Sequence, residues 1–109
     1  MAEIPSDGKS AHETKFSIDQ DTQFKIDSRR NRLLGLWLGE RLGKTESQLE
    51  DYAKSVVIAD LEEPGIEDVM RKVMQDIADA GSDLSDADIR AKLAEFEKEA
   101  RDQILGDND

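Results

Sequence analysis

The side chains that most often perform catalysis are scarce in this chain. Its 109 residues include no cysteine and one histidine, His12, which excludes a thiol nucleophile, a disulfide framework and a cysteine-based zinc site. His12 lies in a polar, aperiodic stretch, which favours a solvated side chain over a general base. Neither GxxxxGK[ST] nor GxGxxG is present, so no standard phosphate loop exists. We expect no catalytic residue, no metal site and no cofactor.

One acidic stretch superficially suggests calcium binding. Residues 82–88 read SDLSDAD, but the central glycine and the terminal bidentate glutamate of a calcium loop are missing at the required spacing. Ser85 with Asp88 three residues later has instead the spacing of a helix N-terminal cap. We therefore interpret this stretch as the start of a helix.

The densest group of cations is a candidate partner-binding surface. Arg29, Arg30 and Arg32 follow Lys25 by about one helical turn. Guanidinium groups can bind the carboxylates of another protein bidentately. They can equally pair with acids of the same chain, where an exposed ion pair stabilises little. The sequence leaves both interpretations open.

Two glycines occur inside a helical pattern, and each costs about 1 kcal/mol relative to alanine there. Gly35 and Gly39 are four residues apart, so they share a helix face and would let another group approach the backbone closely. Close packing within the chain is the favoured interpretation, and a candidate ligand groove along Gly35 and Gly39 is the alternative. Gly43 is interpreted as the end of the helix.

The hydrophobic spacing predicts four helices that would position these groups. The first runs from about Glu13 or Asp19 to Leu42, and the second follows a cap at Thr45 and ends before Pro64. The third is closed by Gly81, and the fourth begins after Ser85. Short connections between four amphipathic helices predict an all-α four-helix bundle.

The N-terminal stretch differs from the rest in its patterning. Pro5, Gly8 and several serines interrupt it without hydrophobic periodicity, so residues 1–18 are expected to be a mobile segment and residues 19–109 the four-helix domain. The N-terminal end of the long first helix is expected to project beyond the other helices, because it lacks a full apolar stripe. That end would be available to a partner.

Composition limits the class of partner. Charged residues make up 38% of the chain and aromatic residues 5%, which favours a helical bundle over a sandwich or barrel. The net charge is −11, and residues 45–109 hold 19 acidic but only 7 basic residues. Such a surface repels nucleic acid and anionic lipid, so a protein partner is favoured, although the charge also serves solubility. No apolar run approaches the roughly 20 residues of a membrane span, and no secretory signal is visible.

Several segments together resemble a known family, the zeta subunits of bacterial ATP synthases. The similarity begins with Lys15-Phe16 and Phe24-Lys25 and is most specific in the run RRNRLLGLW at residues 29–37, followed by ERLG at residues 40–43. It continues through Tyr52-Ala53-Lys54, Glu67-Asp68-Val69 and the start of the fourth helix. The resemblance therefore covers nearly the whole chain from about Lys15.

The resemblance implies an inhibitor that acts by steric blockade and not by chemistry. Its four-helix domain would dock on the catalytic head of the synthase while residues 1–18 become helical between the alpha and beta subunits, near the central stalk. It would be a cytoplasmic protein, peripheral to the inner membrane through the synthase, without direct membrane insertion and monomeric when free. The partner-binding residues would be His12, Lys15, Phe16, Phe24, Lys25, Arg29, Arg30 and Arg32.

Two further expectations accompany this resemblance. Pro5, Gly8 and Ser10 disfavour early helix formation, so inhibition is expected to be weaker than that of family members with a more helix-prone start. The alternative function is an acidic helical adaptor or a regulator that senses a metabolite, such as an adenine nucleotide, in the groove along Gly35 and Gly39.

Overall fold

The structure, a computed structural model, describes residues 18–61 and 65–106. These ranges contain four helices and no strand: α2 (Gln20–Arg41), α3 (Glu46–Asp60), α4 (Glu67–Asp79) and α5 (Asp86–Gly106). The predicted all-α four-helix class is confirmed. His12, Lys15, Phe16 and all but the last residue of segment 1–18 lie outside the described residues, as does Pro64.

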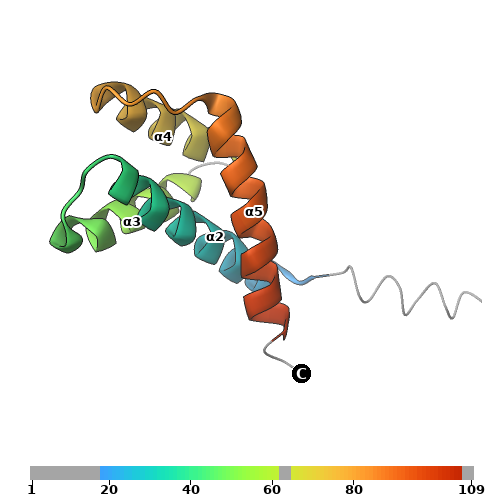
Figure 1. Cartoon of the computed structure of the whole chain (residues 1–109). Coiled ribbons are helices and arrows are strands. Elements are labelled where there is room, and N and C mark those ends of the chain that lie inside the picture. The colour runs from blue at the N-terminus through green and yellow to red at the C-terminus, as the bar shows by residue number, and fades with distance from the viewer. Residues whose placement is uncertain (1–17, 62–64, 107–109) are drawn as a thin grey trace, which may run out of the picture.

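Helix α2 is the central element of the fold (Figure 1). It packs along α3 and also along α5, while α4 contacts α3 and α5. Figure 1 shows α4 at the end of the molecule where α5 begins, and the last turns of α5 beside the first turns of α2. The N-terminal half of α2 is therefore held between two other helices.

Local signals explain where the helices begin and end. Asp19 caps α2 by accepting the Thr22 N–H at 2.7 Å, and this hydrogen bond lowers the pKa of the Asp19 carboxyl. The predicted cap at Ser85 is confirmed, because its Oγ accepts the Asp88 N–H at 3.1 Å while the Asp88 carboxylate accepts the Ser85 N–H at 3.0 Å. The predicted stop at Gly43 is also confirmed, since its φ of 84° is the left-handed conformation that glycine adopts readily.

The core lies where the four predicted apolar stripes meet. Its buried side chains come from all four helices: Leu34, Leu38, Tyr52, Val56, Val69, Met70, Val73, Ile77, Ile89 and Leu93. Ile26 is also fully buried. The expectation that the N-terminal end of α2 projects beyond the other helices is therefore wrong from Ile26 onward, because α5 covers this part of α2.

Gly35 and Gly39 bring α2 and α3 into close contact. A Cβ on Gly35 would lie 2.6 Å from the Ala53 Cα, and one on Gly39 would lie 2.7 Å from Leu49 Cδ2. The Ala53 backbone leaves no room for a methyl group on Gly35, whereas a methyl group on Gly39 would require the end of the Leu49 side chain to shift. Close packing within the chain is therefore confirmed, most firmly at Gly35. The candidate ligand groove along Gly35 and Gly39 is wrong, because α3 fills that face of α2.

Candidate partner-binding surface

The arginine cluster divides into one buried and two exposed side chains. Arg30 is 6% exposed and lies among carboxylates from three helices. Its Nη1 donates to Glu97 Oε1 of α5 at 2.9 Å, and its guanidinium nitrogens lie 3.6 Å from Asp60 Oδ2 of α3 and 3.6 Å from Asp27 Oδ1 of α2. The internal-clamp interpretation therefore holds for Arg30, which does not belong to a surface that a partner could reach.

The carboxylates around Arg30 occupy unequal environments. Asp60 has a side chain only 13% exposed, and burial raises its pKa, while the charge of Arg30 acts in the opposite direction. Asp27 and Glu97 are about one-third exposed, at 30% and 34%. Three acids thus converge on one guanidinium, and Arg30 holds α2, α3 and α5 together by charge as well as by packing.

Arg29 and Arg32 lie on the exposed side of α2. Arg32 donates from Nη1 and Nη2 to the two oxygens of Glu50 at 2.7 and 2.8 Å. This pairing lowers the pKa of Glu50 and raises that of Arg32. Arg29 donates to Gln103 Oε1 at 3.1 Å. Both guanidinium groups are thus oriented by exposed partners, and such contacts are weak enough to exchange for others.

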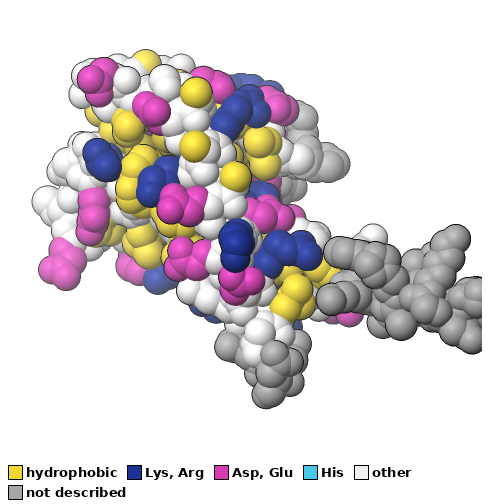
Figure 2. Space-filling model, turned by 45° about the vertical axis from the view of Figure 1, so that its right-hand side comes forward, with side chains coloured by type: hydrophobic (Ala, Val, Ile, Leu, Met, Phe, Trp, Pro, Cys, Tyr) yellow, Lys and Arg dark blue, Asp and Glu magenta, His cyan; other side chains and the backbone are white. Residues whose placement is uncertain are grey.

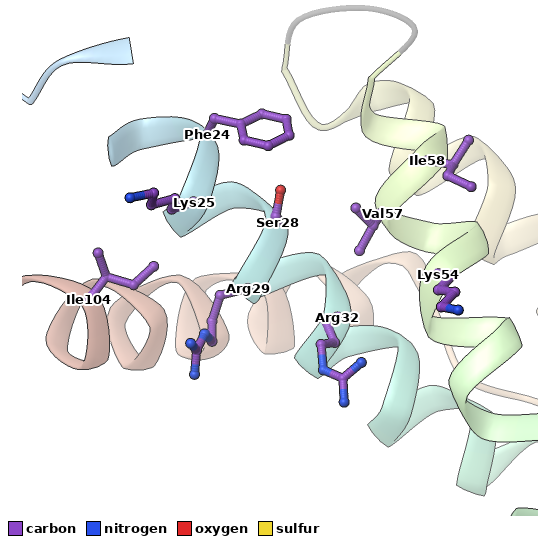
Figure 3. A pocket seen from close by; sticks show the side chains of 9 residues that line it. All are labelled: Phe24, Lys25, Ser28, Arg29, Arg32, Lys54, Val57, Ile58 and Ile104. Atoms are coloured by element: carbon purple, nitrogen blue, oxygen red, sulfur yellow. The ribbon is translucent and has the colours of Figure 1, made fainter. Parts of the chain in front are cut away.

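A groove lies beside these two arginines, between α2 and α3, and we call it the α2–α3 groove. This open groove has a volume of about 550 Å³. Its apolar lining is Phe24, Val57, Ile58 and Ile104, and its cationic lining is Lys25, Arg29, Arg32 and Lys54. Figure 3 shows these side chains projecting from α2, α3 and α5, with Phe24 and Val57 on neighbouring helices.

The groove brings together predicted and unpredicted residues. Phe24, Lys25, Arg29 and Arg32 were predicted to bind a partner, and the structure gathers them along one lining. Val57 and Ile104 were not predicted to bind a partner, and both are half-buried and lie outside the buried core. Lys54 and Ile58 carried no signal of their own, because a single lysine or isoleucine on a helix is common on any surface.

Other features of the described residues bear on the class of function. Figure 2 shows basic and acidic side chains interspersed on one face, with hydrophobic side chains visible between them.

Within residues 18–61 and 65–106, no three His, Cys, Asp or Glu side chains are arranged so that they could hold a metal ion together. No helix in these same ranges is long and apolar enough to cross a membrane. The cap at Ser85 and Asp88 accounts for part of the stretch that superficially suggested calcium binding.

The comparisons with known proteins agree with this arrangement of helices. A solved structure, determined by solution NMR, is 44% identical to the chain and has a TM-score of 0.67. The match covers 78% of this chain and 96% of that one. No curated protein matches. The family model described as ATPase inhibitor subunit zeta matches residues 3–103, which includes most of the N-terminal segment as well as all but the last turn of the four helices. The chain therefore belongs to the ATPase inhibitor subunit zeta family.

Proposed function

We propose that this chain inhibits ATP hydrolysis by the F-type ATP synthase by inserting residues 1–18 into the interface of the alpha and beta subunits. The observation that carries the proposal is the family match over residues 3–103. Family membership supports an inhibitory role at the synthase and a regulatory, non-catalytic protein. The insertion of the N-terminal segment is what the resemblance to the family implies, and the aperiodic sequence of residues 1–18 is compatible with it.

The inserted segment must be held in place by a rigid support. Residues 1–18 lead directly into α2, whose first turn is fixed by the Asp19 cap. Further along, α2 is held against α3 by the close approach at Gly35 and against both α3 and α5 by Arg30. A load on the segment would therefore be transmitted to three packed helices, which supports a steric blockade of a rotary enzyme.

Anchoring also offsets the entropy lost when the segment becomes ordered. Fixing a backbone costs on the order of 1–2 kcal/mol per residue, and Pro5 and Gly8 add to the cost of forming a helix. A four-helix domain already bound to the synthase raises the effective concentration of the segment at its site. We infer that His12, Lys15 and Phe16 contact the synthase within the interface, and that Phe24, Lys25, Arg29 and Arg32 contact it from the domain.

Site-specific cross-linking tests this placement. Because the chain has no cysteine, His12→Cys supplies a unique site for a thiol-reactive photo-cross-linker. After illumination of the inhibited complex, adducts to both the alpha and the beta subunit are expected from position 12, and mass spectrometry would identify them. Lys98→Cys is the matched control, because Lys98 is 80% exposed and lies on α5 away from the groove. Adducts to the synthase from position 98 but none from position 12 would contradict the proposed insertion.

A further inference from the structure

We propose that the α2–α3 groove is a second docking surface, which binds an acidic segment of the synthase head that also carries apolar side chains. This proposal rests on the proposed function for the identity of the partner. It assigns to the groove a role separate from that of the N-terminal segment: the groove holds the domain on the enzyme, and the segment blocks turnover.

The apolar part of the groove is left uncovered within the described structure. Phe24 is 52% exposed and Ile58 is 58% exposed, although both are large hydrophobic side chains. They project from different helices yet line one hollow, together with Val57 and Ile104. A partner that fills the hollow would remove this apolar surface from water, and that burial favours association.

The cations around the hollow select the charge of the occupant. Lys25, Arg29, Arg32 and Lys54 line one groove of a chain whose net charge is −11. Lys25 and Lys54 form no ion pair with another described residue, and Arg29 and Arg32 have exposed partners that a carboxylate from another protein can replace. The groove therefore attracts an acidic segment, while the acidic remainder of the surface repels it and so fixes where it docks.

The position of the groove connects it to the proposed insertion site. Phe24 and Lys25 lie four and five residues after Gln20, where α2 begins, and at 1.5 Å per residue this separation is about 6–8 Å. A subunit that encloses residues 1–18 is therefore within reach of the groove. Residues 1–18 themselves hold three acidic residues and two lysines, which is a poor complement to four cations, so the charge favours the partner as occupant.

The test compares binding and inhibition by the full chain. Ile58→Ser removes an apolar side chain from the groove, and Leu61→Ser is its control, because Leu61 is also 58% exposed but does not line the groove. Ile58→Ser is expected to weaken binding to the purified synthase head by about ten-fold, as burial of one isoleucine predicts. Leu61→Ser is expected to bind as the unchanged chain does. When either variant is present at a saturating concentration, inhibition should still be complete. Circular dichroism would check that each variant is folded.

A charge variant tests the acidity of the occupant. Lys54→Gln is expected to weaken binding at low salt and to reduce the dependence of the dissociation constant on ionic strength, because one screened attraction is lost. Lys98→Gln removes a lysine whose side chain is 80% exposed and which lies outside the groove, and it should change neither quantity.

The possible outcomes separate this proposal from the proposed function. If the unchanged chain binds without inhibiting, and Ile58→Ser still weakens binding, then the groove is upheld and the inhibitory role is not. If Ile58→Ser and Lys54→Gln both bind as tightly as their controls, the groove proposal is overturned while inhibition by the segment stands. A shift in the amide resonances of residues 1–17 in the free Ile58→Ser chain would identify the chain's own start as the occupant and would also overturn the proposal.

Discussion

Deletion of residues 1–18 is expected to abolish inhibition of ATP hydrolysis while the four-helix domain stays folded. The deletion removes none of the buried core residues that the structure describes, the first of which is Ile26. It also retains Asp19, whose carboxylate caps α2. Circular dichroism and the cooperativity of thermal unfolding should therefore change little. Inhibition should be lost because the blocking element is gone, even though the groove still binds the enzyme.

Two controls define what this deletion means. A chain in which residues 1–18 are replaced by a glycine-serine linker of the same length should also fail to inhibit, because the linker keeps the length but not the side chains. A peptide of residues 1–18 alone should inhibit poorly, since it lacks the anchoring contacts that offset its ordering entropy. Steady-state hydrolysis by the purified synthase head is the assay. Equal inhibition by the truncated and the intact chain would show that the inhibitory function lies in the four-helix domain.

Replacing Arg30 by glutamine is expected to destabilise the fold far more than the same change at Arg29 or Arg32. Loss of Arg30 leaves Asp27, Asp60 and Glu97 without their shared cation. Removing one partner of a buried ion pair costs about 3–5 kcal/mol, and the lower end applies here because Asp27 and Glu97 are partly exposed. Arg29→Gln and Arg32→Gln should each cost no more than about 1 kcal/mol, as exposed contacts do.

Denaturation in urea at several pH values would measure these differences and their cause. Because the pKa of Asp60 is raised by burial, this carboxyl binds a proton more readily in the folded than in the unfolded state. The contribution of the Asp60 carboxyl to the free energy of unfolding therefore rises as the pH falls through its folded-state pKa. The penalty of Arg30→Gln should shrink on acidification as the uncompensated Asp60 carboxylate becomes neutral. A loss in Arg30→Gln no greater than that in Arg29→Gln would show that Arg30 is not an internal clamp.

The helix ends were predictable because local rules determine them. The cap at Ser85 and the left-handed Gly43 depend on residues within one turn, so the sequence contains the whole signal. The close approach at Gly35 was also foreseeable, since an interior glycine needs a compensating contact. The sequence did not show that α3 would supply this contact, because the contact joins residues 35 and 53 across a turn.

The sequence predicts only in part which arginines of the cluster are buried and which are exposed. Ile26, Arg30, Leu34 and Leu38 follow one another at intervals of four, and this spacing places Arg30 on the buried face of α2 and both Arg29 and Arg32 on the exposed side. Two of the three acids that compensate Arg30 come from α3 and α5, 30 and 67 residues away, and sequence spacing does not reveal such pairs. The α2–α3 groove is still harder to predict from the sequence, because Ile58 and Lys54 line it only as a result of the packing of α3 on α2.

The most direct test of the inhibitory role is a titration of the purified synthase head with the intact chain under steady-state ATP hydrolysis. Our account predicts a saturable loss of hydrolysis that follows binding, with a dissociation constant that increases with ionic strength. Binding would be followed in the same samples, so that occupancy and turnover are compared directly. Undiminished hydrolysis by a head that is fully occupied by the chain would contradict the account.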